Sequence, residues 1–194
     1  MAMAGPISGQ PAAVVARPQR ADARRNRERI LEAGRKAFAE SGRDVQMDEI
    51  AQLAGVGVGT LYRHFPTKED LVFAIVREAV QTYVESTQHA LTRADPWEAI
   101  EWLVREKAAN MARNRGLRDA MSVIQFGDEN PWHSAEARSG AEAVLERARL
   151  AGAIRADITV DDWQALTCGL SAAIASGADP GRHAEFVLAA LRAR

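Results

Sequence analysis

The feature that most constrains the fold of this chain is a pair of short helical segments around a glycine turn, in the stretch 47–70 (MDEIAQLAGVGVGTLYRHFPTKED). The pattern predicts one helix over 47–54, a stop at Gly55 and a second helix over 58–65. Gly55 stands where a tight turn needs an unusual backbone angle, and Ala51 is small enough to let the second helix approach closely. We therefore expect a helix-turn-helix whose small shared core contains Ile50, Leu53, Val56, Leu61 and Phe65.

The second of these helices presents a polar face that suits DNA. Because successive residues turn by about 100° in an α-helix, an inward Leu61 places Phe65 beside it and Arg63 opposite. Threonine and tyrosine hydroxyls bind phosphate oxygens, arginine pairs with a guanine edge, and glycine leaves room to approach the groove floor. The alternative is an ordinary solvated helix face, but that interpretation must also account for the turn and for a run of arginines upstream. The residues predicted to face DNA are Val58, Gly59, Thr60, Tyr62, Arg63 and His64.

Charge is distributed unevenly along the chain, although the formal net charge is only −1. Residues 17–69 hold 11 Lys and Arg against 8 Asp and Glu, whereas residues 70–194 hold 14 against 18. A basic front and an acidic rear indicate that the N-terminal part faces an anion. Lys68 begins the next expected helix, where its ammonium group and the free amides of the helix end offer a phosphate site. Six arginines also lie close together in sequence: Arg17, Arg20, Arg24, Arg25, Arg27 and Arg29.

Composition argues against several classes of protein. The one cysteine, Cys168, allows no intramolecular disulfide, which is typical of the reducing cytoplasm. No apolar run approaches the roughly 18 residues that span a bilayer. Residues 1–16 carry no positive charge and lack the apolar stretch of a secretory signal. We therefore expect a cytoplasmic protein without a membrane partner.

The rest of the chain is predicted to be almost entirely helical. Several later helices are predicted to start at a residue that is a good N-cap. The N-cap is either Asp or Asn followed by a proline, or Thr followed three residues later by an acidic residue. These starts are Thr67, Asp95, Asn130, Thr159 and Asp179. We expect an all-α protein of about nine helices, the later ones near 68–90, 96–114, 117–126, 131–151, 160–176 and 180–192.

Three regions are expected along the chain. Residues 1–21 contain three prolines and no periodicity, so a disordered arm is predicted there. Residues 22–66 are predicted to form the DNA-binding helix-turn-helix domain. Residues 67–194 are predicted to form a helical body that binds a ligand and makes a dimer.

Several groups of residues form one extended pattern: Arg29-Ile30-Leu31-Glu32-Ala33, Phe38, Gly42, Ile50-Ala51, Ala54-Gly55-Val56, Gly59-Thr60-Leu61-Tyr62, His64-Phe65 and Lys68-Glu69-Asp70-Leu71. This pattern resembles the N-terminal signature of the tetracycline-repressor (TetR) family. The resemblance covers residues 24–72, and the remainder is similar to the family in length and all-helical character. One departure is Gln46, where members usually carry Ser or Thr as an N-cap and phosphate contact.

The resemblance implies a mode of DNA binding. It implies that Thr60, Tyr62, Arg63 and His64 face DNA, and that Lys68 and an arginine such as Arg24 or Arg27 meet phosphates. It also implies a homodimer on a palindromic double-stranded operator. The geometric reason is that two recognition helices must reach successive major grooves, about 34–36 Å apart or a multiple of that.

The last two expected helices are the candidates for the dimer interface. Residues 165–177 (ALTCGLSAAIASG) are dense in small side chains, which let two helices pack closely. These residues have the alternative of packing within one subunit, but a regulator with paired DNA-binding heads favours the dimer. In the family, the two helices usually pair with their twofold copies as a four-helix bundle. The candidate interface residues are Cys168, Ala172, Ala175, Phe186, Leu188 and Leu191.

The middle helices are expected to hold a ligand pocket. Pockets are mainly apolar with a few placed polar groups, and this part of the chain is rich in tryptophan and methionine. The same residues are also ordinary components of a helical core, so they favour a moderately apolar ligand only weakly. The candidate pocket residues are Trp97, Trp102, Met111, Met121, Phe126, Trp132, His133 and Trp163, with His89, Asp128 and Glu129 as further polar groups.

Together these features predict a ligand-responsive regulator without a cofactor, most simply a repressor that a small-molecule effector releases from DNA. Ligand in the body shifts a population by moving the fourth helix, which carries the DNA-binding head. An activator or a ligand-independent DNA-binding protein has the same fold and stays open as an alternative. An enzyme is disfavoured, because the four histidines lack metal-ligand spacing, Cys168 has no histidine nearby and the glycine-rich stretch 55–59 follows no strand.

Overall fold

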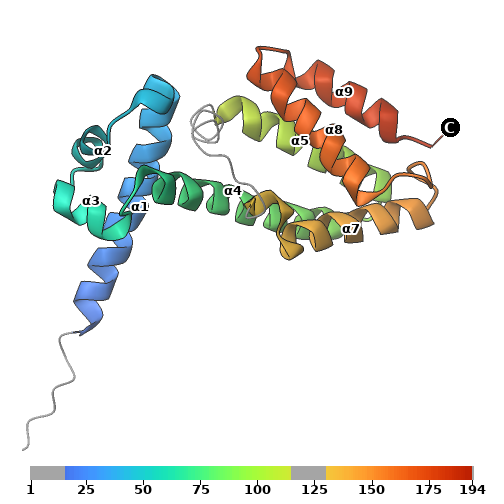
Figure 1. The fold of residues 1–194 in the computed structure, drawn as a ribbon. Helices are drawn as coiled ribbons and strands as arrows, with labels where there is room; N and C mark the ends of the chain where they lie inside the picture. Colours follow the sequence, from blue (N-terminus) through green and yellow to red (C-terminus); the bar gives the residue numbers. More distant parts are fainter. Residues whose placement is uncertain (1–15, 115–129, 194) are drawn as a thin grey trace, which may run out of the picture.

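A computed structural model of the chain describes residues 16–114 and 130–193, and these residues fold into helices joined by short turns (Figure 1). The predicted all-α class is confirmed. The helix expected over 117–126 lies outside the described residues. The described ranges contain eight α-helices and two short 3-10 helices: α1 (Ala16–Ser41), η1 (Gly42–Asp44), α2 (Met47–Ala54), α3 (Val58–His64), α4 (Lys68–Leu91), α5 (Pro96–Arg113), η3 (Pro131–His133), α7 (Ala135–Leu150), α8 (Val160–Ala175) and α9 (Pro180–Leu191).

The first helix begins earlier than the sequence predicts. A disordered arm is expected over 1–21, but α1 already begins at Ala16. Pro18 is the third residue of α1, and the first four amides of a helix have no intrahelical acceptor, so proline removes no hydrogen bond there. The arginines and alanines that follow it are good helix formers. The expected arm is therefore wrong over residues 16–21, and residues 1–15 lie outside the description.

Local capping signals place most helix starts where the sequence predicts them. The Thr67 hydroxyl accepts a hydrogen bond from the Asp70 amide (3.1 Å), and the Asp70 carboxylate accepts one from the Thr67 amide (3.0 Å). Asp95 accepts from the amide of Trp97 at 2.7 Å, directly before α5. Asp179 caps α9 in the same way. Each cap satisfies amides that the first helical turn leaves without a partner.

One predicted helix, over 131–151, is divided in two. Asn130 caps only the short helix η3, where its side-chain oxygen accepts from the amide of Trp132 (3.1 Å). Ser134 then starts α7, and its side chain accepts from the amide of Ala137. The backbone at Ser134 is extended (φ −59°, ψ 150°), as an N-cap requires, so the helix cannot run through this residue.

Two hydrophobic cores lie at the two ends of α4. The first joins α1, α2 and α3, which we call the head, to the N-terminal half of α4 around Phe38, Leu61 and Leu71. The second joins α5, α7, α8 and α9, which we call the body, and includes Leu145 and Trp163. The head stands apart from the body in Figure 1, with α4 running between them. Among the described residues, no helix combines the length and apolar character needed to cross a membrane.

The C-terminal half of α4 is fixed firmly to α7. A Cβ atom on Gly140 of α7 would lie 2.3 Å from the hydroxyl oxygen of Thr87, so only glycine allows this close crossing. Below the crossing, the Arg147 guanidinium donates to the carbonyls of Leu91 (2.9 Å), Arg93 (2.6 Å) and Ala94 (2.8 Å). These carbonyls belong to the end of α4 and the following turn, where backbone acceptors have no helical donor.

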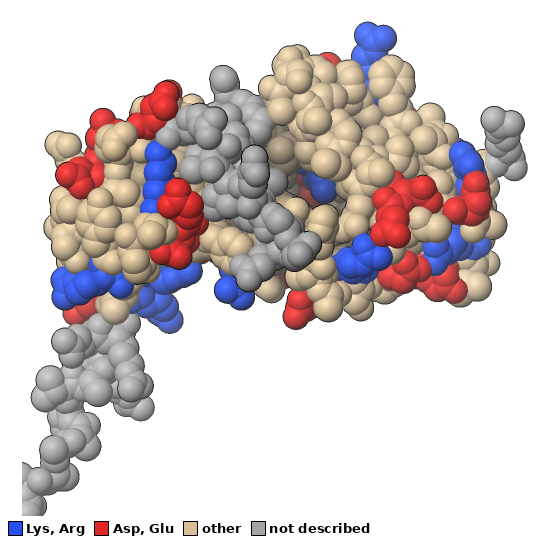
Figure 2. Space-filling model, in the orientation of Figure 1, with Lys and Arg blue, Asp and Glu red and all other residues tan. Residues whose placement is uncertain are grey.

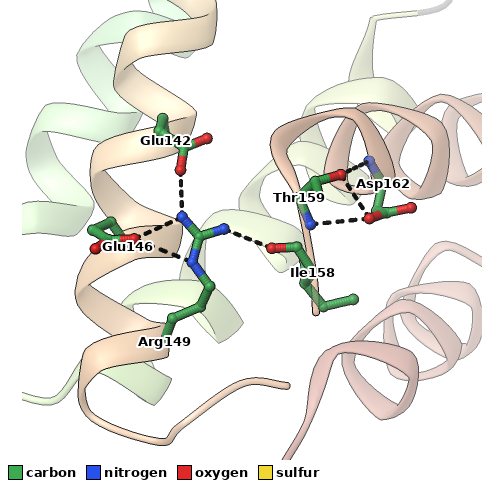
Figure 3. A network of polar contacts seen from close by, with 6 residues as sticks. All are labelled: Glu142, Glu146, Arg149, Ile158, Thr159 and Asp162. Carbon is green, nitrogen blue, oxygen red and sulfur yellow. Dashed lines mark hydrogen bonds and ion pairs between the residues drawn. The ribbon is translucent and has the colours of Figure 1, made fainter. Parts of the chain in front are cut away.

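The connection between α7 and α8 is held by a second arginine (Figure 3). The Arg149 guanidinium binds Glu142 and Glu146 on its own helix and donates to the carbonyl of Ile158 at 2.6 Å. Directly after Ile158, Thr159 and Asp162 form the capping box that starts α8. The two polar groups together set the direction in which α8 leaves the turn.

Candidate DNA interface and effector cavity

The turn between α2 and α3 requires glycine because of its backbone conformation. Gly55 has φ 62° and ψ 38°, which is the left-handed conformation that other residues rarely adopt. The amide of Val56 then closes the helix end by donating to the Ala51 carbonyl (3.0 Å). In addition, the Arg29 guanidinium of α1 donates to the Gly55 carbonyl (3.0 Å), and a Cβ at Gly55 would lie 2.5 Å from it. The predicted turn residue therefore also docks α1 onto the helix-turn-helix.

The start of α2 is capped from its third residue. The Glu49 carboxylate accepts from the backbone amide of Gln46 at 2.9 Å. The side-chain amide of Gln46 donates to the Asp44 carbonyl at 2.7 Å instead of reaching outward. This bond gives no support to a phosphate contact at Gln46.

The two faces of α3 differ as the helical rotation predicts. Leu61 and Phe65 are buried in the head core. On the opposite side Val58, Gly59 and Tyr62 are exposed, and a Cβ at Gly59 would meet nothing within 4 Å. The predicted core position of Leu53 is wrong: its side chain is 52% exposed, because Ile50 and Ala54 occupy the inner face of α2.

Arg63 lies along the exposed face of α3. Its Nε donates to the Gly59 carbonyl (3.1 Å) and its terminal nitrogen to the Thr60 hydroxyl (2.9 Å). Neither acceptor is a carboxylate, and no ion pair to Arg63 occurs among the described residues. The guanidinium is thus pre-positioned next to Thr60 with its charge uncompensated, while His64 beside it is partly buried.

The arginines of α1 occupy a neighbouring surface of the head. Arg24 is exposed and lies 3.6 Å from Glu28. Arg27 lies 3.7 Å from Glu78 of α4 and stacks over the ring of Phe65 with its guanidinium carbon 5.5 Å from the ring centre. Figure 2 shows basic side chains along the lower edge of this lobe, next to the N-terminal part of α1. Exposed pairs of this kind are weak, so these arginines remain able to exchange partners.

Lys68 has a role inside the protein that the sequence does not indicate. Its ammonium group donates to the Val45 carbonyl at 2.6 Å and lies 5.8 Å from the centre of the Phe38 ring. The side chain is partly buried and joins the start of α4 to the segment before α2. A phosphate contact by Lys68 remains a prediction.

A cavity of about 270 Å³ lies in the body, bounded by α4, α5, α7 and α8 and by η3. Four of the predicted pocket residues line it: Met111, Trp132, His133 and Trp163. The predicted residues Met121, Phe126, Asp128 and Glu129 lie outside the described residues.

Three of the predicted residues, Trp97, Trp102 and the further polar candidate His89, do not line the cavity. The guanidinium carbon of Arg192 lies 4.6 Å from the ring centre of Trp97. Trp102 contacts the ring of His89, with the ring centres 4.7 Å apart, and the guanidinium carbon of Arg93 lies 5.0 Å from its ring centre. The reason is helical rotation. On α5 the cavity receives Leu103, Lys107 and Met111, which are four residues apart and share one face, whereas Trp97 and Trp102 point elsewhere.

The two most informative cavity residues, Lys107 and Tyr83, are not among the residues predicted from the sequence. The Lys107 ammonium lies 5.4 Å from the Tyr83 ring centre and 5.1 Å from that of Trp132. Burial lowers the pKa of Lys107 to about 8 and raises the pKa of Tyr83 to about 12. The Tyr83 hydroxyl accepts a hydrogen bond from the indole nitrogen of Trp163 (2.9 Å). The spacing along α5 is the sequence signal for Lys107. It lies four residues after Leu103 and four before Met111, so the three side chains share one face of the helix.

The surface formed by α8 and α9 divides the predicted dimer residues. Cys168, Ala172, Ala175 and Phe186 are exposed, and Phe186 keeps 55% of its surface accessible. The prediction is wrong for Leu188 and Leu191, which are buried in the body core and offer no surface to a partner. Small residues on the outer face of α8 and large ones on the inner face of α9 account for this division.

Two family models together match most of the chain. Residues 30–75 match bacterial regulatory proteins of the tetR family. Residues 95–192 match the C-terminal domain of SbtR-like transcriptional regulators. An HTH-type transcriptional regulator of Staphylococcus aureus is 44% identical over 66 residues, which make up 34% of this chain and 36% of that relative. The match to this curated relative thus spans about a third of its length.

Two solved structures resemble the whole fold. A TetR transcription regulatory protein from Mycobacterium vanbaalenii is 36% identical, with a TM-score of 0.66 over 90% of this chain and 99% of that one. A TetR transcriptional regulator from Streptomyces coelicolor is 32% identical, with a TM-score of 0.64 over 86% of this chain and 98% of that one. The similarity therefore includes both the head and the body.

Proposed function

Because the chain belongs to the tetR family of bacterial regulatory proteins, we propose that it is a repressor that binds a palindromic operator as a homodimer and is released by a small-molecule effector. Membership of this family makes the protein a transcriptional regulator with a helix-turn-helix and not an enzyme. The observation that carries the proposal is the exposed, uncompensated Arg63 on the outer face of α3.

The outer face of α3 carries groups of the kinds that contact DNA bases and phosphates. Arg63 and Thr60 lie side by side, so one can pair with a base edge while the other meets a phosphate. Gly59 carries no side chain and has open space around it, which lets the backbone approach the groove floor. Tyr62 and Val58 add exposed contact surface, and Arg24, Arg27 and Lys68 supply phosphate contacts at the flanks. His64 stays at the rim of this surface.

Pairing of two subunits through α8 and α9 supports the two-headed arrangement that a palindrome needs. Exposed Phe186 stands beside an apolar groove whose floor includes Leu166 and Gly169. Exposed large apolar side chains of this kind are typical of interaction sites. The small residues Ala172 and Ala175 lie on the outer face of α8, where a second copy can approach closely.

The cavity supports release by an effector because α4 forms one of its walls. Ala79, Thr82 and Tyr83 of α4 line the cavity, and the same helix carries the head at its N-terminal end. A ligand that binds more tightly when α4 lies in the DNA-incompetent position shifts the population towards release. A coupling of about 1–3 kcal/mol is typical for such a mechanism.

The proposal is tested with the DNA that flanks the protein's own gene. Arg63→Ala should lower the affinity for the shifted fragment by about 1–3 kcal/mol and relax base preference at one position in each half-site. Arg105→Ala is the control, because Arg105 is exposed on α5, far from the head in sequence. An Arg63→Ala protein with unchanged affinity and base preference contradicts the assignment. Deletion of the gene should raise expression from the bound promoter, and a fall contradicts repression.

A further inference from the structure

Lys107 is a basic group of the cavity wall that has no carboxylate partner among the described residues, and the acidic group that interacts with it electrostatically is the thiol of Cys168. Lys107 meets the faces of Tyr83 and Trp132, and among the described residues its ammonium makes no hydrogen bond and no ion pair. The one carboxylate in the described lining, Glu106, accepts from Asn110 (2.8 Å) and lies 3.1 Å from Arg113, outside this pair of rings. The charge of Lys107 is therefore available to a ligand in the cavity.

The arginine of the wall, Arg138, is already neutralised. The Arg138 guanidinium donates to the Asp161 carboxylate (2.8 Å) and to the side-chain oxygen of Gln164 (3.0 Å). Gln164 in turn donates to the Trp132 carbonyl (3.2 Å). These groups hold the wall together, so Arg138 has its partner and Lys107 is the charge that a ligand meets.

Two hydrogen-bond donors on the aromatic side chains next to Lys107 have no acceptor among the described residues. The Tyr83 hydroxyl accepts from Trp163, and its own proton has no acceptor among the described residues. The buried indole N–H of Trp132 likewise has none. Burial without an acceptor is costly for a donor, and a ligand that supplies lone pairs removes that cost. The site therefore favours an acceptor over a donor, and an anion over a neutral group.

The remainder of the wall is apolar and the space is small. Leu103, Met111, Ala141, Val160 and the ring of Trp163 line it. A volume of about 270 Å³ is at the lower end for ligand pockets. The body of the ligand is consequently a compact apolar group.

Building on the proposed function, we propose that the effector is a small monocarboxylate with an apolar body, whose carboxylate pairs with the Lys107 ammonium and accepts from the Tyr83 hydroxyl. The rings of Tyr83 and Trp132 hold the ammonium in place before the ligand arrives. The apolar body fills the space towards Leu103, Met111 and Val160. Lys107 thereby selects acids over their neutral analogues.

The test compares acids with their own amides by calorimetry. The probes are 3-phenylpropanoate with 3-phenylpropanamide, and octanoate with octanamide, measured on the full chain at pH 6.5. At least one acid should bind tighter than its amide by about tenfold or more, as expected for a charge-assisted bond in a protected site. Equal affinity of acid and amide in both pairs, or no binding by either acid, overturns the proposal.

Variants assign the preference to Lys107. Lys107→Met should remove the preference for the acid by weakening the binding of the acid more than that of the amide, whereas Lys107→Arg should retain the preference. Arg105→Met is the matched control, because it removes the same charge from the same helix outside the cavity and should change neither affinity. If Lys107→Met does not fold, the acid preference of Lys107→Arg is compared with that of the wild type. A retained preference supports the proposal, and a lost preference contradicts it. An acid preference that persists in a folded Lys107→Met protein overturns the proposal.

The outcome is separable from that of the proposed function. Calorimetry measures ligand binding without DNA, so a preference for acids is detectable even if no operator is found. Conversely, a protein that binds its operator and is released equally by acid and amide retains the proposed function and loses this inference alone.

Discussion

Replacing Lys107 by methionine should stabilise the ligand-free protein at neutral pH. Burial lowers the pKa of Lys107 from 10.5 to about 8. Since each pKa unit corresponds to about 1.4 kcal/mol, keeping the ammonium charged in the folded protein costs about 3 kcal/mol relative to the unfolded chain. Methionine keeps an unbranched, adaptable side chain against the two rings but carries no charge. The lost cation–π contacts offset about 1 kcal/mol, so a gain of about 1–3 kcal/mol is expected.

The gain should depend on pH with a definite sign. Between pH 8 and 10.5 the unfolded chain keeps the Lys107 proton while the folded protein has lost it, so the stability of the wild type rises with pH in this window. Lys107→Met lacks this rise. The advantage of the variant is therefore greatest below pH 8 and vanishes as pH approaches 10.5.

Other titrating groups surround Lys107 and contribute to the stability of both proteins. Tyr83 faces it from α4, Glu106 lies beside it on α5, His133 is the last residue of η3, and Arg138 and Cys168 line the cavity from α7 and α8. Burial raises the pKa of Tyr83 to about 12, which lowers the stability of both proteins above pH 10. The difference between wild type and variant at each pH therefore contains the contribution of Lys107 and its coupling to Tyr83 and Cys168.

The assay is urea unfolding followed by far-ultraviolet circular dichroism, at fixed protein concentration from pH 6.5 to 10. Fixed concentration is needed because dimer formation contributes to apparent stability. Arg105→Met controls for removal of a basic group from α5. A Lys107→Met protein no more stable than wild type at pH 7, or a difference that does not shrink at high pH, would refute the view that this ammonium is held charged at a cost.

Three further predictions concern the head and the interface. Gly55→Ala should lose about 1–3 kcal/mol of unfolding free energy, because φ is 62° there, whereas Gly59→Ala should lose none yet weaken operator binding. Lys68→Met should cost about 1 kcal/mol through the lost bond to a carbonyl, and should lower the salt slope of DNA binding by about one. Phe186→Asp should shift the protein to monomer in sedimentation experiments, whereas Leu150→Asp, at an even more exposed apolar site, should not.

The sequence predicts the head well because its determinants are local. Gly55 alone requires the left-handed turn, and Leu61 alone fixes which way α3 faces, so neither depends on distant contacts. The helix starts at Thr67 and Asp95 are likewise set by side chains two or three residues from the amides they cap. Leu53 is the exception. A leucine is expected to be buried because it is large and apolar, but the small Ala54 beside it occupies the buried position instead.

The cavity is predicted less well because it depends on how four helices rotate against one another. Tryptophan count favours Trp97 and Trp102, but both lie on faces of α5 where arginines cover them. Lys107 has an ordinary sequence context, and its importance comes from Tyr83 and Trp132, which lie far from it along the chain. A tertiary arrangement of this kind leaves only a faint periodic signal in the sequence.

The fold restricts how a ligand in the cavity can affect DNA binding by the head. The C-terminal end of α4 is held by Arg147, so displacement there breaks three hydrogen bonds to carbonyls. The cavity-facing stretch begins at Ala79, next to Glu78, which binds Arg35 (2.6 Å) and Arg27 of α1. If a ligand displaces the wall, the body end of α4 resists the movement, and we expect the head end to transmit it to α1 through the partly exposed ion pairs of Glu78. An effector acts through this path only as far as its contacts to Lys107 and Tyr83 differ between the two positions of α4.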